Sequence, residues 1–414
     1  MRLKRAMVAR EMQRGEGGTG DIYQGDACKL LPRLIERYGG QVQLIYIDPP
    51  FATGQQFEVR VRVGEKEHKS GVGTLTLPAY RDALDEMEYL GMMRTMLEGA
   101  RALLGERGTI FLHIDHRMHA KLRLLMDEIF GPEQFLNEIV WAYQTGGRAR
   151  KHFSRKHDII LFYSKTKRYF FDLAPVAISR EGVRRNHMKR HVDPDGRVYR
   201  SIRSGEKVYT YYDDEPTYPS DVWDDVSHLQ QKDPQRTGYD TQKPLPLLER
   251  IVLCASKEGD LVCDLFAGSG TTLDAARRHG RRFLGVDESP MAMHVIRRRM
   301  MGANVTYHML PASGEPTVEI CAQMGVGFYE LEITQYAMEP GACPRDFAGL
   351  DALDGWTVGY LRGGAFVAMA HAQRSKATPK IKTHLQLPIL EGVPMIRTTD
   401  VLGRGFYYEI VEGG

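Results

Sequence analysis

The sequence predicts an α/β protein built around a parallel β-sheet, and three observations support this class. The apolar stretch Leu44–Ile47 runs into Asp48-Pro49-Pro50-Phe51, which is typical of a buried strand followed by a stiff turn. Residues 22–47 fit one strand–helix–strand unit of a parallel sheet. A further strand beginning at Leu261 runs into Gly268-Ser269-Gly270 and then into a helix. In such sheets, ligands bind at the edge formed by the carboxyl ends of the strands.

Composition sets the outer limits of the interpretation. The 414 residues suffice for two or three domains, and 42% hydrophobic and 26% charged residues are ordinary for a globular protein. No apolar run approaches the roughly 18 residues of a membrane span, and the basic N-terminus lacks the apolar core of a secretory signal. The five cysteines are scattered and form no CxxC pair, which indicates a reducing cytosol and argues against a zinc site.

The elements follow from local pattern in chain order. Residues 1–20 are polar and Gly-rich and predict a loose lead-in, and residues 55–80 predict a long flexible loop. The expected strands are 22–26, 44–47, 108–115, 135–143, 158–163, 261–265 and 282–287, and the expected helices are 27–37, 82–104, 117–130 and 272–279.

Residues 148–207 are strongly basic. They hold 17 Lys and Arg against six acids, a balance of 17 − 6 = +11 in a chain of net charge +3, with aromatic residues interleaved. Clustered cations supply the salt-dependent part of nucleic-acid affinity, so this segment predicts a phosphate-binding surface rather than a plain solvated face. The run Arg297–Arg299 is the second candidate for such contacts.

The Gly268–Gly270 turn points to a nucleoside-containing cofactor. Glycine lets the backbone bend sharply and approach a ligand, and the helix that follows offers free N–H groups. Leu273 stands where the pattern GxGxxG needs glycine, which argues against a standard NAD site. Asp287 ends the next strand, 17 residues after Gly270, at a position from which a carboxylate can hold ribose hydroxyls.

Asp48, Pro49 and Phe51 together suit a flat ring that bears an amino group. The aromatic side chain can stack on the ring, while the carboxylate and the Pro49 carbonyl accept the amino hydrogens. The alternative is a strand that merely ends in a Pro-Pro turn. His113, Asp115, His116 and His119 could suggest a metal cluster, but no further ligand set is visible, so we expect them to line the cleft or to cap a helix.

Five stretches in one order resemble the amino-DNA methyltransferases of the β class, including the modification subunits of type III restriction systems. They are IYIDPPFATG, HDIILFYSK, TQKPLPLLERIV, DLFAGSGTTLDAA and FLGVDES, and the resemblance spans roughly residues 22–300. It implies a Rossmann-like, S-adenosyl-L-methionine-dependent methyltransferase fold. That fold has a mixed seven-stranded sheet, an inserted DNA-recognition region and a small C-terminal appendage.

The resemblance also implies roles for individual residues. The catalytic motif is Asp48, Pro49, Pro50 and Phe51, with Phe51 in place of the commoner tyrosine. The implied cofactor-binding residues are Asp26, Lys243, Asp264, Phe266, Gly268, Gly270, Thr271 and Asp287. The predicted DNA-binding residues are Arg148, Arg150, Lys151, Arg184, Arg185, Lys189 and Arg190, and no metal is expected.

These observations predict a site-specific methyltransferase that acts on N6 of adenine in double-stranded DNA by base flipping and direct transfer. N4-cytosine methylation and an inactive DNA-binding module with this fold stay open as alternatives. We expect a catalytic half in residues 1–147, a recognition region in 148–235 that includes a returning core strand, a cofactor half in 236–304, and an appendage of unknown role in 305–414. A restriction subunit and a second copy of the chain are open as partners. A bacterial cytoplasmic, nucleoid-associated location without membrane contact is expected.

Overall fold

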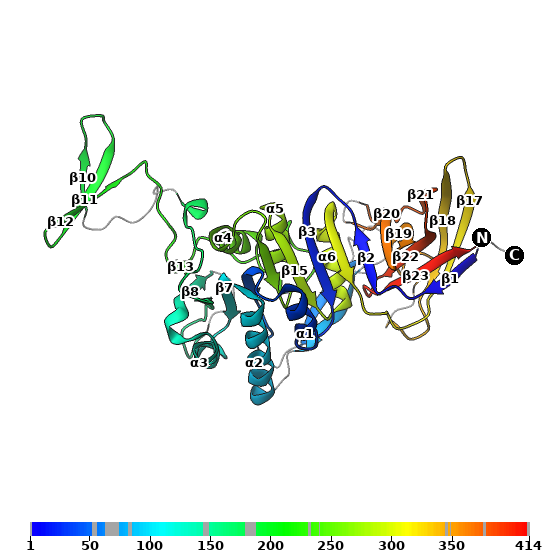
Figure 1. The fold of residues 1–414 in the computed structure, drawn as a ribbon, viewed down its shortest axis with the longest axis horizontal. Coiled ribbons are helices and arrows are strands. Elements are labelled where there is room, and N and C mark those ends of the chain that lie inside the picture. The colour runs from blue at the N-terminus through cyan, green and yellow to red at the C-terminus, as the bar shows by residue number, and fades with distance from the viewer. Residues whose placement is uncertain are drawn as a thin grey trace.

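One long β-sheet runs through the molecule (Figure 1). The computed structural model describes residues 2–51, 56–62, 74–81, 85–143, 149–178, 188–230, 233–239, 241–343, 347, 349–375 and 378–411. Within these residues the strand order is β1 (Arg2–Ala6), β23 (Gly405–Val411), β22 (Val393–Asp400), β19 (Leu353–Arg362), β20 (Ala365–Gln373), β2 (Arg10–Gln13), β16 (Ala303–His308), β3 (Gly17–Gln24), β15 (Arg282–Asp287), β14 (Leu261–Asp264), β4 (Val42–Ile47), β7 (Leu104–Ile114), β9 (His157–Ser164), β8 (Phe135–Ala142) and β13 (Val222–Trp223).

The run β3-β15-β14-β4-β7-β9-β8 is the mixed seven-stranded sheet that the sequence predicts. Its strands are parallel, except that β9 runs antiparallel to both β7 and β8. Strands β4 and β14 consist largely of fully buried apolar residues, as expected where helices cover both faces of a parallel sheet. The predicted α/β fold class is therefore confirmed.

Six helices cover the two faces of this sheet. The first apolar core lies under α1 (Ala27–Tyr38), α2 (Glu86–Leu103) and α3 (His119–Phe130). The second core, on the other face, lies under α4 (Leu245–Ala255), α5 (Thr271–Arg278) and α6 (Pro290–Arg299). Two short 3₁₀ turns, η1 (Pro132–Gln134) and η2 (Ala174–Val176), complete the described helical elements. Asp26 caps the N-terminus of α1, since its carboxylate accepts a hydrogen bond from the Cys28 N–H at 2.9 Å.

Two sequence-based expectations about loops are wrong. Residues 1–20 are not a loose lead-in, because β1 pairs with β23 and β2 pairs with both β16 and β20. The described parts of segment 55–80 form an antiparallel pair, β5 (Gln56–Arg62) and β6 (Thr74–Arg81), while residues 55 and 63–73 of the predicted loop lie outside the described residues. Its alternating, β-branched residues favour strands, whereas the partners of β1 and β2 lie hundreds of residues away and leave no local signal.

The C-terminal region is built of strands. β17 (Thr317–Met324), β18 (Phe328–Ala337) and β21 (His384–Pro388) form a separate sheet. This sheet shares an apolar core with β19, β22 and β23, so the described residues from 312 onward form two packed β layers without a helix. Because β20 pairs with β2, these layers continue the sheet of the α/β part (Figure 1).

A third β element projects from the opposite end of the molecule (Figure 1). β10 (Lys189–Val192), β11 (Val198–Ser204) and β12 (Lys207–Tyr212) form an antiparallel three-stranded sheet within the basic segment. We refer to residues 189–212 as the arm.

Candidate active site

Four neighbouring parallel strands, β3, β15, β14 and β4, end at one edge of the sheet. Each strand ends at or just before an acidic residue that the sequence singled out, namely Asp26, Asp287, Asp264 and Asp48. All four residues line one pocket of about 1560 Å³. This volume exceeds the roughly 300–1,000 Å³ of a typical small-molecule site, so the pocket has room for two ligands side by side.

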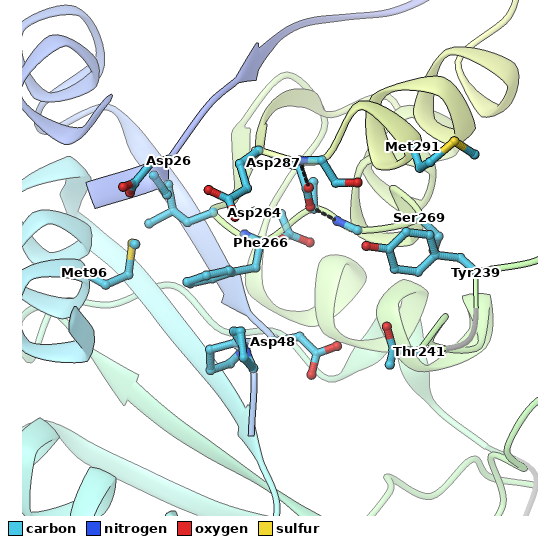
Figure 2. A pocket seen from close by; sticks show the side chains of 18 of the residues that line it. Asp26, Asp48, Met96, Tyr239, Thr241, Asp264, Phe266, Ser269, Asp287 and Met291 are labelled. Carbon is cyan, nitrogen blue, oxygen red and sulfur yellow. Dashed lines mark hydrogen bonds between the residues drawn. The ribbon is translucent and has the colours of Figure 1, made fainter. Parts of the chain in front are cut away.

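Figure 2 shows how the labelled side chains surround this pocket. Asp26 and Met96 lie on one side, and Tyr239 and Met291 lie on the other. Phe266 lies between these sides, and Asp48 comes from the neighbouring strand end. The structure thus brings together residues that the sequence separates by more than two hundred positions.

The two carboxylate oxygens of Asp48 have different surroundings. Oδ2 forms an ion pair with the Lys243 ammonium group. Oδ1 is buried and has no hydrogen-bond partner among the described residues. Since a buried acceptor without a donor costs free energy, Oδ1 is an open acceptor facing a ligand pocket. Pro49 and Pro50 stiffen the backbone that carries it.

Lys243, which the resemblance assigns to the cofactor, contacts two residues of the catalytic motif. Besides pairing with Asp48, its ammonium group lies 5.4 Å from the centre of the Phe51 ring. The pairing holds the Asp48 carboxylate in one orientation and compensates its charge. The assignment of Lys243 to the cofactor stays a prediction, to which the structure adds this second contact.

A buried network of polar side chains lies behind Phe51. The sequence-based expectation placed His113 at the cleft but did not include the hydrogen bonds of this network. His113 Nδ1 is 2.8 Å from the Tyr46 hydroxyl, and His113 Nε2 is 3.3 Å from Asp158 Oδ2. The Tyr143 hydroxyl donates to Asp158 at 3.1 Å. Burial opposes the charge on Asp158, but His113, the Lys243 charge and the Tyr143 hydroxyl together outweigh this effect and lower the Asp158 pKa. Two features of the sequence could have indicated these contacts: His113 lies near the end of a predicted strand, and Asp158 belongs to the HDII stretch.

His228 is a second residue of this wall that the sequence gave no reason to choose. Its ring stacks on Trp141 with centroids 4.8 Å apart, and it lines the same pocket as Asp48. Burial, assisted by the nearby Lys243 charge, lowers the pKa of His228 to about 4. The ring is therefore neutral at physiological pH, with one donor nitrogen and one acceptor nitrogen.

The sharp glycine turn that the sequence predicts between β14 and α5 has left-handed backbone geometry. Gly268 has φ 49° and Gly270 has φ 74°, a region that side chains with a Cβ rarely adopt. The Gly268 N–H donates to Asp287 Oδ2 at 2.8 Å, so the turn and the end of β15 are joined (Figure 2). A Cβ on Gly270 would lie 2.9 Å from Ile296 Cγ1, so the close neighbour is α6. Thr271, the first residue of α5, also lines the pocket.

The acids of this edge differ in their charge state. Burial raises the pKa of Asp264 to about 7, and the nearby Asp48 and Asp287 charges add to the shift. Burial also raises the pKa of Asp287 to about 6, although the Ser289 and Gly268 N–H groups counteract it. A carboxyl near its pKa at neutral pH can accept or donate a hydrogen bond, which suits a ligand with hydroxyl and amino groups.

The predicted DNA contacts lie in different parts of the basic segment. Arg150 and Lys151 are exposed, and Lys189 and Arg190 are exposed on β10 of the arm. Arg148, Arg184 and Arg185 lie outside the described residues. In the second candidate, Arg297–Arg299, Arg297 is buried against Glu11, Arg299 lies 3.7 Å from Asp274, and Arg298 donates to the Arg374 carbonyl, so these cations are engaged within the fold.

The arm presents cations beside exposed apolar and aromatic side chains. Tyr209 and Val208 are largely exposed on β12, next to strand β11 with Arg203. Some arm cations are already compensated, since Arg197 forms two 2.8 Å hydrogen bonds to Asp214. Within the described part of the chain, no carboxylate lies within 4.0 Å of the cations of Lys189, Arg190, Arg203 or Lys207.

The described residues also bear on metal binding and on membrane insertion. No group of three or more His, Cys, Asp or Glu residues there has the arrangement of a metal site. His113, Asp115, His116 and His119 instead take part in hydrogen bonds and ion pairs with their neighbours. None of the described helices is long and apolar enough to cross a membrane.

Residues 42–298, more than half of the chain, match the model of a protein family described as DNA methylase. The type II methyltransferase M.EcaI of Enterobacter cloacae is 32% identical over 67% of this chain and 68% of its own length. The Mod subunit of the type III enzyme StyLTI from Salmonella typhimurium is 26% identical over 61% of this chain and 48% of its own length. The DNA adenine methyltransferase YhdJ of Escherichia coli is 26% identical, over 64% and 77% respectively.

Proposed function

The chain belongs to the N6/N4 DNA methylase family, whose model matches residues 42–298, and on that premise we propose that it methylates N6 of adenine at a specific site in double-stranded DNA. As a member of this family it is an S-adenosyl-L-methionine-dependent DNA methyltransferase. The observation that carries the proposal is the open acceptor Asp48 Oδ1, held beside the Pro49 carbonyl on a rigid turn at the pocket.

The surroundings of Asp48 fit activation of an aromatic amine. The lone pair of such an amine is delocalised into the ring, so the amine is a poor nucleophile. Asp48 Oδ1 and the Pro49 carbonyl accept its two hydrogens, and the nitrogen then becomes more tetrahedral and directs its lone pair outward. Phe51 stacks on the base after it has left the duplex. Lys243 keeps the carboxylate oriented, so catalysis comes from positioning and charge stabilisation.

The residues of the strand edge fit the cofactor. The Gly268–Gly270 turn lets the backbone approach the cofactor, the start of α5 offers backbone donors, and Asp287 at the end of β15 accepts ribose hydroxyls. Phe266 provides an apolar face, while Asp26, Asp264, Thr271 and Lys243 supply polar contacts. S-adenosyl-L-methionine supplies an electrophilic methyl group on its sulfonium. The amino nitrogen gains that methyl and loses one proton, which Asp48 is placed to accept.

The choice of adenine over cytosine rests on Asp48. An aspartate at the head of this motif favours adenine, where a serine would favour the amino group of cytosine. YhdJ is named for adenine methylation, which supports the same choice. N4-cytosine methylation is the second candidate, since the family includes both activities. An inactive DNA-binding module is the third, and the intact acidic and glycine residues of the pocket speak against it.

We assign DNA recognition to residues 148–235. The catalytic half of the methyltransferase is assigned to residues 1–147 and its cofactor-binding half to residues 236–304. The basic residues of the recognition region supply phosphate contacts, which position the protein, and its polar and aromatic side chains contact base edges. A restriction subunit is a proposed partner, because StyLTI, a relative, is named as a Mod subunit. We further propose that the protein acts on DNA in the bacterial nucleoid. A homodimer is the second proposed assembly.

One experiment separates these candidates. The chain and its Asp48→Ala variant are expressed in a bacterial host that lacks other DNA methylases, and single-molecule sequencing reads the modified bases. We expect N6-methyladenine at one sequence motif with the parent chain and none with the variant. N4-methylcytosine would instead establish the second candidate. Unmodified DNA, together with DNA binding by the purified chain, would establish the inactive module.

A further inference from the structure

The C-terminal region contributes to the wall of the ligand pocket. Leu402, in the turn between β22 and β23, lines the same pocket as Asp48, Phe266 and Asp287. Ala342 and Leu310, which also follow the end of the family match at residue 298, line it too. An appendage with its own separate role would not be expected to reach this pocket.

The turn that carries Leu402 is held firmly. Asp400 Oδ1 accepts from the backbone N–H groups of Leu402 and Arg404, each at 2.9 Å. The Arg404 side chain bridges Asp400 at 2.7 Å and Glu339 at 2.6 Å. The Val401 N–H donates to the Ala352 carbonyl at 3.0 Å. Leu402 is therefore presented at a fixed position rather than on a loosely tethered loop.

This turn packs directly against the segment that follows Asp287. Gly403 has φ 77°, and a Cβ added to it would lie 2.8 Å from the Pro290 carbonyl oxygen. Val401 belongs to one apolar cluster with Met291 of α6 and Tyr239 of the loop before α4, and Leu402 packs against that cluster. Tyr239 and Met291 form the side of the pocket opposite Asp26 and Met96 (Figure 2).

Two buried polar contacts fix α6 to the C-terminal layers as well. His294 Nε2 lies 2.9 Å from Asp354 Oδ2, and both side chains are almost fully buried. Glu11 of β2 joins Arg297 of α6 at 2.9 Å to Arg397 of β22 at 2.8 Å. The helix that begins beside the cofactor site is thus bonded to residues on β2, β19 and β22.

We propose that the described C-terminal layers complete the cofactor pocket, with Leu402 as an apolar contact of bound S-adenosyl-L-methionine. The inference rests on the family's use of this methyl donor, but it does not depend on which base is methylated. The Leu402 side chain closes the Met291–Tyr239 side of the pocket against water. This exclusion strengthens the polar contacts that Asp287 and the glycine turn make with the ligand.

Calorimetric titration with S-adenosyl-L-methionine, in the absence of DNA, tests the proposal. We expect Leu402→Ala to raise the Kd by roughly tenfold or more, since lost methylenes in an apolar contact have effects of this size. Leu402→Glu should raise it further, because it also places a charge among the apolar side chains of the Met291–Tyr239 side. The matched control is Val326→Glu, an equally drastic change at a 97% exposed position of the same layers, which should leave the Kd unchanged.

A second variant acts through the turn and changes the chemical identity of no pocket-lining side chain. Gly403→Ala forces a Cβ toward the Pro290 carbonyl and must displace the turn, so its Kd should rise as well. Thermal melting establishes which variants are folded, and Leu402→Ala, the mildest change at a half-buried position, decides the case if the others unfold. Kd values for folded Leu402→Ala and Leu402→Glu within twofold of the parent chain would overturn the proposal. Absence of binding heat with the parent chain would instead contradict S-adenosyl-L-methionine dependence itself.

Discussion

Lys243 holds Asp48 through Oδ2, while Oδ1 is left for a ligand. The two oxygens therefore have different tasks: Oδ2 fixes the carboxylate within the fold, and Oδ1 takes part in the chemistry. By the same contact Lys243 touches the catalytic motif, and it also lines the pocket. His113, Asp158 and Tyr46 stiffen the wall behind Phe51. At the scale of single residues, the site is therefore a set of oriented acceptors backed by buried partners.

Asp48→Ala should abolish methyl transfer while S-adenosyl-L-methionine binding survives. The lost acceptor at the reacting nitrogen is worth about 3 kcal/mol or more, which is roughly a hundredfold or greater loss in kcat. Transfer of a radiolabelled methyl group to DNA gives the rate, and calorimetry gives the cofactor affinity. Asp48→Asn keeps the shape and one acceptor oxygen, so it should retain more activity than the alanine variant. Activity of Asp48→Ala within tenfold of the parent chain would remove Asp48 from the mechanism.

Gly270→Ala should weaken cofactor binding by about tenfold or more, because its Cβ meets Ile296 at 2.9 Å and shifts the turn. Gly259→Ala is a matched control, since Gly259 also has a left-handed φ, 82°, but has nothing within 4 Å of the added Cβ. Both variants acquire backbone strain, yet only the first should change the Kd in a calorimetric titration. Equal Kd values for the two variants would reduce the Gly270 turn to a structural role.

At the scale of elements, the arm is separated from the chemistry. It lies at the far end of the molecule from the C-terminal layers, and its cations stand beside exposed Tyr209 and Val208 (Figure 1). An element with this charge and shape can contact the DNA backbone without disturbing the strand edge. Exchange of the arm, residues 189–212, for that of a relative should therefore change the methylated sequence and leave Asp48 chemistry intact, as single-molecule sequencing would report.

Replacing Lys189, Arg190, Arg203 and Lys207 together by alanine should weaken binding to every duplex. Each lost phosphate contact should flatten the slope of log K against log salt by about one unit, so the total change is up to about four. Fluorescence anisotropy at several salt concentrations measures this slope. Arg197→Ala is the control, because its guanidinium is already paired with Asp214 and should contribute little. An unchanged slope in the quadruple variant would place the phosphate contacts outside the arm.

Sequence reasoning reached the parts of the molecule that local pattern specifies. The strand into Asp48 and the turn at Gly268–Gly270 were predictable because an apolar run and a special residue lie next to each other. The partner strands of β2 and the pocket contact of Leu402 were not, because they depend on contacts between residues that lie one hundred or more positions apart in the sequence. The position of His228 was missed for a related reason, since stacking on Trp141 has no signature in spacing.

At the scale of the whole molecule, the buried Glu11 carboxylate joins the α/β part to the C-terminal layers. Burial opposes its charge, but Arg297 and Arg397 outweigh this effect and hold the pKa of Glu11 below its usual value. A carboxylate of lowered pKa stabilises the fold above the pKa of the unfolded chain. That contribution is lost as the pH falls through the folded pKa, so it contributes to unfolding in acid below about pH 4.

Glu11→Gln should destabilise the protein at pH 7 by about 3 kcal/mol or more, because it leaves two buried guanidinium groups without their counter-charge. Urea denaturation followed by circular dichroism measures the change. Glu319→Gln, on an exposed position of β17, removes the same charge and should have little effect. If the two variants unfolded at the same urea concentration, Glu11 would not be the joint between the two parts.

The pairing of β2 with β20 also means that the sheet is completed only late in synthesis. A ribosome makes Arg10–Gln13 about 350 residues before it makes Ala365–Gln373, a delay on the order of tens of seconds at 5–20 residues per second. During that interval the nascent chain already carries Asp48 and the glycine turn but lacks Leu402 and the C-terminal anchors of α6. Under the proposed role of Leu402, the cofactor pocket is complete only after β22 and β23 emerge, so a polypeptide that ends before Leu402 should bind S-adenosyl-L-methionine more weakly than the full chain.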